Sequence, residues 1–111
     1  MPTLFLDPGR LRDELRLEAP VDTPDGLGGA TRSWVEVRSL FGFVEPVSAS
    51  APIRGDGPDP VVTHRIFVRR AADIDGTMRL RKGDRIFSIF TVSDPDESGR
   101  YLLIEAEEAG R

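Results

Sequence analysis

The sequence predicts an all-β domain, a small and mostly antiparallel barrel of about six strands with one long projecting loop. Three observations predict this fold. Apolar residues recur with a period of two in short segments, nine prolines and eleven glycines separate those segments, and the chain shows no heptad or internal repeat. A length of 111 residues suits a single domain that spans positions 1–111.

The chain is expected to begin with a turn and a strand. Asp7 can cap a helical turn that starts at Pro8, because proline fits the first helical position. Residues 11–19 fit either a helix, by their i,i+4 leucines, or a strand, by their period of two. We favour a short turn followed by a strand that stops at Pro20.

The next segments predict a long hairpin. Residues 21–30 are rich in proline and glycine, which indicates a turn-rich loop. Residues 31–44 form the longest extended stretch, and their apolar face switches near Arg38 and Ser39. An added residue inverts the face of every later side chain, so the switch predicts a β-bulge or a barrel corner. Gly42 inside this strand is typical of a tight bend.

The second half of the chain predicts the long loop and the remaining strands. Residues 47–60 are expected to form the projecting loop, since they are rich in alanine, proline and glycine. Strands are expected at 61–70, at 78–81 and at 85–92, the last of which is apolar on both faces and therefore central. Residues 101–108 form the last strand, after a hairpin loop.

Composition excludes several classes of function. The chain has no cysteine, which excludes disulfides, thiolate metal sites and cysteine nucleophiles. His64 is its only histidine and lies among core-facing residues, so we expect a buried structural histidine, no multi-histidine metal site and no catalytic base. The start of the chain shows no signal peptide pattern. We therefore expect no enzyme activity, no metal and no cofactor.

Charge indicates contacts between subunits. With 15 basic and 19 acidic residues the chain has a net charge of −4, which argues against a free surface for nucleic acid. Its basic residues cluster in the middle of the chain and its acidic residues near the end, so opposite patches could meet head to tail in a ring, with the single tryptophan as an anchor. The candidate interface residues are Trp34, Arg65, Arg69, Arg79, Arg81, Glu105 and Glu107.

The order of motifs resembles one known family. The motifs are Gly9-Arg10-Leu11-Arg12, Pro24-Asp25-Gly26, Trp34-Val35-Glu36-Val37, Phe43-Val44-Glu45-Pro46, Thr63-His64-Arg65-Ile66 and Asp94-Pro95-Asp96-Glu97-Ser98-Gly99-Arg100-Tyr101-Leu102. In this order they resemble the phage head closure proteins, also called head–tail adaptor, joining or stopper proteins, over residues 9–108. The segment Phe41-Gly42-Phe43 departs from the family, which often has a tryptophan there.

The resemblance implies a structural role in a phage, a prophage or a gene transfer agent. It implies a homo-oligomeric ring, with a hexamer favoured and a dodecamer as the alternative, made in the bacterial cytoplasm and placed in the connector of the particle. The ring would contact the portal and its adaptor on one side and the tail terminator or tail tube on the other. Double-stranded DNA would pass through it without sequence-specific binding, and no membrane is implied.

The long loop is the candidate lining of the DNA channel. Its small and stiff residues can reach a ring axis, and its aspartates leave it weakly negative, which would let DNA slide. The candidate channel residues are Ala51, Pro52, Ile53, Arg54, Gly55, Asp56, Gly57 and Asp59. The alternative function is a monomeric β-barrel module that binds an oligonucleotide or a peptide, which would need an aromatic and basic face on adjacent strands.

Overall fold

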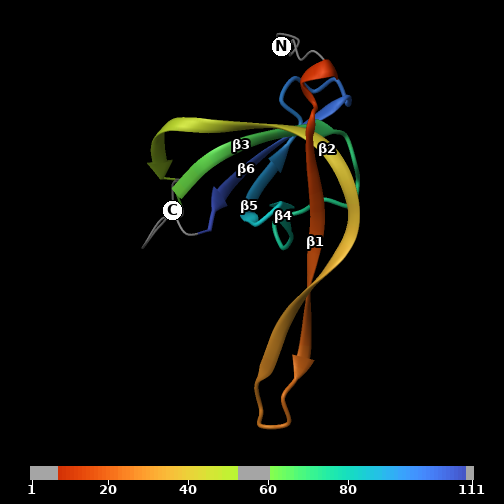
Figure 1. The fold of residues 1–111 in the computed structure, drawn as a ribbon, viewed down its shortest axis with the longest axis vertical. Coiled ribbons are helices and arrows are strands. Elements are labelled where there is room, and N and C mark those ends of the chain that lie inside the picture. Colours follow the sequence, from red (N-terminus) through yellow and green to blue (C-terminus); the bar gives the residue numbers. More distant parts are fainter. Residues whose placement is uncertain (1–7, 53–60, 110–111) are drawn as a thin grey trace.

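The computed structural model describes residues 8–52 and 61–109. In these ranges a 3-10 helix, η1 (Pro8–Arg10), precedes six strands: β1 (Asp13–Pro24), β2 (Ala30–Pro52), β3 (Val61–Arg69), β4 (Arg79–Lys82), β5 (Arg85–Ser93) and β6 (Tyr101–Glu108). The strands close into a barrel in the order β1-β2-β3-β6-β5-β4 (Figure 1). All neighbouring strands are antiparallel. The predicted fold class is confirmed.

Strand β1 is longer than the sequence predicts. The prediction that it stops at Pro20 is wrong, because β1 continues to Pro24 and Pro20 lies opposite Trp34 of β2. Strand β4 pairs only with residues 16–18 of β1, so beyond them β1 has one edge without a partner strand in the described chain. A proline is tolerated there because its missing N–H faces no partner. The connecting loop is therefore shorter than predicted, and β1 and β2 project from the barrel as a two-stranded hairpin (Figure 1).

Strand β2 contains the predicted bulge and the predicted bend. Leu17 pairs with Arg38 and the next residue pairs with Glu36, so Val37 is the extra residue, one position before the predicted switch. At Gly42 a Cβ atom would lie 2.9 Å from the carbonyl oxygen of Phe67. The glycine therefore allows two backbones to approach closely where β2 turns over the barrel.

Strand β2 also extends beyond its predicted end. The loop was predicted to begin at 47, but β2 continues to Pro52 and pairs with β3 through Pro52↔Val61. The register is irregular between Pro46 and Ala51. Strands β2 and β3 thus form a second arm, which leaves the barrel in a different direction from the hairpin (Figure 1). Of the candidate channel residues, Ala51 and Pro52 belong to this arm, and the remainder, within 53–60, lie outside the described residues.

The core fills the closed part of the barrel. Strand β2 packs the partly buried Leu40 and Val44 against it. The fully buried side chains come from the other five strands and are mainly branched aliphatic, with one phenylalanine: Leu15, Leu17, Ile66, Val68, Leu80, Phe87 and Ile104. The alternation predicted for β3 is confirmed, with inward residues buried and Arg65 and Arg69 exposed. Strand β5 pairs with β4 and β6, as every strand of a closed barrel pairs on both sides, so the barrel has no central strand of the kind predicted for β5.

Candidate functional site

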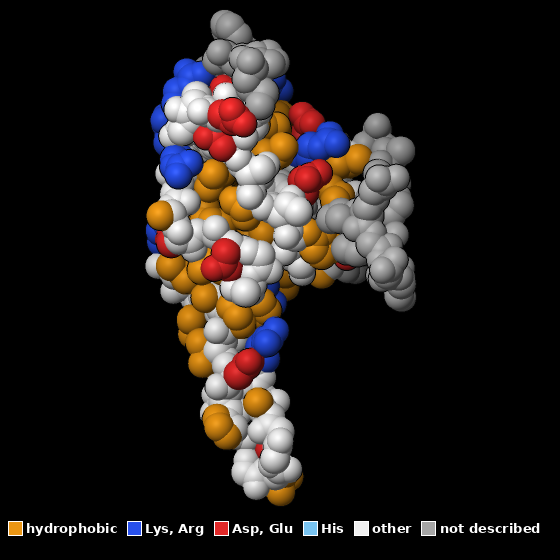
Figure 2. Space-filling view, turned by 180° about the vertical axis from the view of Figure 1, so that it is seen from behind, with side chains coloured by type: hydrophobic (Ala, Val, Ile, Leu, Met, Phe, Trp, Pro, Cys, Tyr) orange, Lys and Arg blue, Asp and Glu red, His pale blue; other side chains and the backbone are white. Residues whose placement is uncertain are grey.

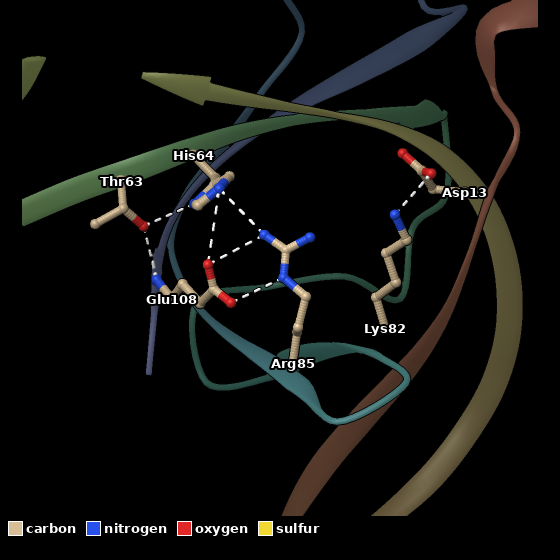
Figure 3. Close-up of polar contacts among 6 residues, drawn as sticks. All are labelled: Asp13, Thr63, His64, Lys82, Arg85 and Glu108. Atoms are coloured by element: carbon tan, nitrogen blue, oxygen red, sulfur yellow. Dashed lines mark hydrogen bonds and ion pairs between the residues drawn. The ribbon is translucent and has the colours of Figure 1, made fainter. Parts of the chain in front are cut away.

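A polar cluster closes one end of the barrel, and we call it the polar mouth. It comprises Thr63 and His64 of β3, Lys82 of β4, Arg85 of β5, Glu108 of β6 and Asp13 of β1 (Figure 3). The antiparallel order brings the beginnings of β1, β3 and β5 beside the ends of β4 and β6, which is why residues far apart in sequence meet here.

The centre of the polar mouth is a charged pair beside a histidine. The guanidinium of Arg85 donates to both carboxylate oxygens of Glu108, at 2.8 and 3.1 Å. His64 is 2% exposed; its Nε2 lies 3.4 Å from Nη2 of Arg85, and its Nδ1 lies 2.9 Å from Oγ1 of Thr63. The same Oγ1 accepts the N–H of Glu108 at 2.7 Å. Each polar group therefore has a partner, as burial requires.

A second ion pair continues the polar mouth. Nζ of Lys82 lies 3.0 Å from Oδ1 of Asp13, and the N–H of Val44 donates to Oδ2 at 3.0 Å. Burial alone would raise the pKa of Asp13, but the hydrogen bonds from Lys82 and Val44 hold this pKa below its ordinary value.

The polar mouth is built as a structural closure. Edge-on contact with Phe87, at 5.1 Å between ring centres, packs His64 against the core. The expected buried histidine is therefore found. No group of three or more His, Cys, Asp or Glu within 8–52 and 61–109 could hold a metal ion. No helix in the same ranges is long and apolar enough to cross a membrane.

The projecting hairpin exposes apolar side chains. Val21 is 40% exposed, Val35 48% and Leu27, at the tip, 90%. Figure 2 shows orange side chains along the hairpin and at its end. An isolated two-stranded hairpin is marginally stable in water, so such a projection favours a surface that is completed by another molecule.

At its base the hairpin is fixed to the barrel through Trp34. The guanidinium of Arg79 lies 4.2 Å from the centre of the Trp34 ring, and its Nε donates to Glu18 at 2.6 Å. Arg81 lies 3.7 Å from the same carboxylate. Three predicted interface residues therefore meet on one patch, and all three have contacts within their own chain.

The other predicted interface residues lie on β3 and β6. Arg65 pairs with Glu105 of the same chain at 4.0 Å, and Glu105 also accepts a hydrogen bond from Thr91 at 3.0 Å. Arg69 is exposed at the end of β3, and Glu107 is half-buried opposite Ser88. The structure thus separates the predicted residues into several patches, and their role between subunits stays a prediction.

The end of the molecule opposite the hairpin tip holds a pocket that the sequence did not reveal. This terminal pocket, of about 410 Å³, is lined by Leu11, Arg38, Leu40, Phe41, Arg69 and Arg70. Arg38 pairs with Asp73 at 2.9 and 3.1 Å, and this hydrogen bonding lowers the pKa of Asp73. The pocket joins Leu11, which follows η1, to residues of β2 and of the end of β3, so its prediction needs the pairing of β2 with both β1 and β3.

Comparisons with known proteins agree with this geometry. Residues 6–109 match the family model described as phage head completion protein. A chain from the virion of a native gene transfer agent particle is 30% identical, with a TM-score of 0.68, over 90% of this chain and 96% of that one. A protein from Shigella flexneri 2a, determined in solution, is 25% identical, with a TM-score of 0.71, over 96% of this chain and 99% of that one. No curated protein matches.

The family match covers nearly the whole chain, and the fold agrees with the virion chain along most of both lengths. The predicted resemblance is confirmed: this chain belongs to the phage head completion protein family and is a structural component of a virion at the connection of head and tail.

Proposed function

We propose that this protein forms a ring in a phage-type head–tail connector, where it extends the DNA channel below the portal and adaptor. The ring helps to retain packaged DNA and offers a docking platform to the tail. One observation carries the proposal: the family match over residues 6–109 coincides with a similar fold in the virion of a gene transfer agent.

The extended shape of the chain supports assembly. Its radius of gyration is 15.2 Å, against about 13 Å for a compact chain of this length. Its accessible surface is 7128 Å², against roughly 6,100 Å² for a compact monomer of this mass. The excess is of the order of one partner's share of a standard protein interface, about 800 Å². A homo-oligomer, with a hexamer favoured over a dodecamer, would cover this surface.

The second arm supports a role in the channel. Segment 53–60 is joined at both ends to a strand pair, Pro52↔Val61, at the end of an arm that extends past His64 of the polar mouth. An arm held by two paired strands can carry a loop away from the barrel and toward a ring axis. In sequence the loop has two aspartates and one arginine, a charge that would bind DNA phosphates weakly.

Capture by the portal complex tests the ring. The chain is mixed with assembled portal and adaptor, separated from free protein, and weighed by native mass spectrometry. A complex with a whole ring of copies, six in the favoured case, is expected. The proposal is refuted if the tail attaches to the portal and adaptor while this chain stays unbound.

Replacement of the arm's loop tests the channel. Asn-Gly in place of residues 53–60 joins Pro52 to Val61 by the two-residue turn that suits an antiparallel pair. Tail-less heads with this variant are expected to bind the ring but to expose their DNA to nuclease. The matched control keeps residues 53–60 in reverse order, with the same length and charge, and is expected to retain DNA. Full protection by the Asn-Gly variant in a normal ring would count against the channel role.

One surface favours the alternative, a monomeric module that binds an oligonucleotide or a peptide. Phe43 and Phe67 lie opposite each other on β2 and β3 with ring centres 6.2 Å apart, and Arg10 lies 4.4 Å above Phe43. Aromatic rings flanked by a guanidinium can stack bases. A chain that stays monomeric with portal and adaptor, and that loses oligonucleotide binding upon Phe67→Ala, would support this alternative.

A further inference from the structure

The hairpin tip presents an apolar side chain on a preorganised loop. Leu27 is 90% exposed. Oδ1 of Asp25 accepts the N–H of Leu27 at 2.7 Å and the N–H of Gly29 at 3.1 Å. Gly26 and Gly28 have φ of 81° and 86°, a conformation that glycine adopts without strain. The loop is thus held by its own hydrogen bonds, with a leucine and a carboxylate displayed together.

The terminal pocket offers the complementary chemistry. Leu11, Leu40 and Phe41 supply apolar lining, and Phe41 is 56% exposed. Of its three arginines, Arg38 pairs with Asp73, and Arg70 faces Asp94 at 3.9 Å. The third, Arg69, has no acidic partner within 8–52 and 61–109. The pocket therefore combines an apolar wall with one guanidinium whose charge is not balanced by a described neighbour.

The hairpin tip and η1, which directly precedes the pocket residue Leu11, lie at opposite ends of the molecule (Figure 1). The longest extent of the molecule is 52 Å. Leu11 directly follows η1 at one end, and the loop 25–29 closes the hairpin at the other. A tip therefore cannot reach the pocket of its own chain. A contact between two different surfaces of identical chains is head to tail, and it closes into a ring when the rotation between copies permits.

We infer that the hairpin tip of one copy docks into the terminal pocket of the next copy. Leu27 packs against Leu11, Leu40 and Phe41, and the carboxylate of Asp25 lies toward Arg69. This inference rests on the proposed ring and names the contact that joins its subunits. Burial of one leucine side chain corresponds to a change of roughly ten- to a hundredfold in the association constant.

Disulfide trapping tests the contact directly, because the chain has no cysteine of its own. Particles are assembled with Leu27→Cys/Phe41→Cys, oxidised and separated without reductant. A ladder of covalent multimers is expected, since each copy would link to the next. The control Leu27→Cys/Ser88→Cys places the second thiol on the exposed outer surface of β5, and no ladder beyond a dimer is expected.

Side-chain truncation gives an independent measure. Leu27→Ser and Phe41→Ser are expected to weaken recruitment into the connector about tenfold or more, whereas Val37→Ser, at the exposed bulge, leaves recruitment unchanged. Because all three side chains are exposed, the variants are expected to unfold at the same temperature as the original chain.

The outcomes distinguish failure of the tip-to-pocket contact from failure of the proposed ring. A ring seen by native mass spectrometry without a disulfide ladder overturns the tip-to-pocket contact and leaves the proposed function standing. A chain that joins no portal complex overturns the ring itself. Linkage of Leu27→Cys to an adaptor or tail protein, in place of a ladder, shows that a different protein occupies the contact and also overturns the inference.

Discussion

Replacement of Gly42 by alanine is expected to destabilise the barrel markedly. A Cβ atom at this position would lie 2.9 Å from Cδ1 of Leu15, 2.9 Å from the carbonyl oxygen of Phe67 and 3.0 Å from Cγ1 of Val68. A leucine side chain can shift, but the carbonyl belongs to the paired strand β3 and cannot shift without breaking the sheet. Overpacking of a core costs about 1–3 kcal/mol, and the rigid carbonyl places this site near the upper end.

Thermal and urea unfolding measure this cost. For a domain of this size about 2–3 kcal/mol corresponds to a melting temperature lower by roughly 10 °C. Gly83→Ala is the control, because its Cβ would meet open space and only the positive φ of 60° would cost about 1 kcal/mol. Gly42→Ala is therefore expected to cost clearly more than Gly83→Ala.

A double-mutant cycle identifies the clash. Leu15→Val removes the Cδ1 atom that the new methyl group would meet, so Gly42→Ala/Leu15→Val is expected to be more stable than the sum of the single changes predicts. A melting temperature within about 2 °C of the original for Gly42→Ala would refute the reasoning, because the close approach of β2 and β3 would then not be required.

Three further changes probe the polar mouth and the hairpin base. Glu108→Gln is expected to lower the free energy of unfolding by about 1–3 kcal/mol in urea titrations, because it leaves the guanidinium of Arg85 without its carboxylate; an unchanged value would contradict a structural role for the polar mouth. Trp34→Ala is expected to cost about 1–2 kcal/mol through the lost stacking of Arg79, whereas Trp34→Phe keeps most of it; equal losses would argue against the stack. The pKa of Asp13 is lower in the folded chain, so its contribution to the free energy of unfolding is complete above about pH 4 and is lost as the pH falls further. Asp13→Asn is therefore expected to make the loss of stability in acid less steep. An unchanged dependence of the free energy of unfolding on pH would contradict this.

The sequence predicted the elements whose side chains contact the core. Strand β3 alternates because its inward residues meet one apolar interior, so Ile66 and Val68 alternate with Arg65. Strand β5 and the bend at Gly42 follow from the same packing. The order of the motifs predicts the family. Each motif alone is a weak signal, but their succession along the chain, at separate turns and strands, is specific.

The arms and the sites escaped prediction for a physical reason. Outside the barrel no core imposes a period of two on the sequence. The prolines and small residues at the projecting ends of β1 and β2 therefore predict loops, although these segments are strands. The polar mouth depends on pairs distant in sequence, such as Arg85 with Glu108, which meet only because β5 lies beside β6. The terminal pocket likewise brings Leu11, which precedes β1, to Arg69 at the end of β3, because β2 pairs with both strands.

The prolines within the described strands explain how this chain can expose open strand edges. Pro20 and Pro24 lie in the hairpin, Pro46 and Pro52 lie in the second arm, and β3 to β6 contain none. An exposed edge is a template for uncontrolled strand addition, and proline blocks it because it has no N–H to donate. In the proposed ring, arms protected in this way would remain open before assembly and would contact other copies through side chains, as the inferred tip-to-pocket contact requires. Pro20→Val is accordingly expected to favour aggregation over assembly. This result would distinguish strand addition from side-chain docking as the way in which copies contact one another.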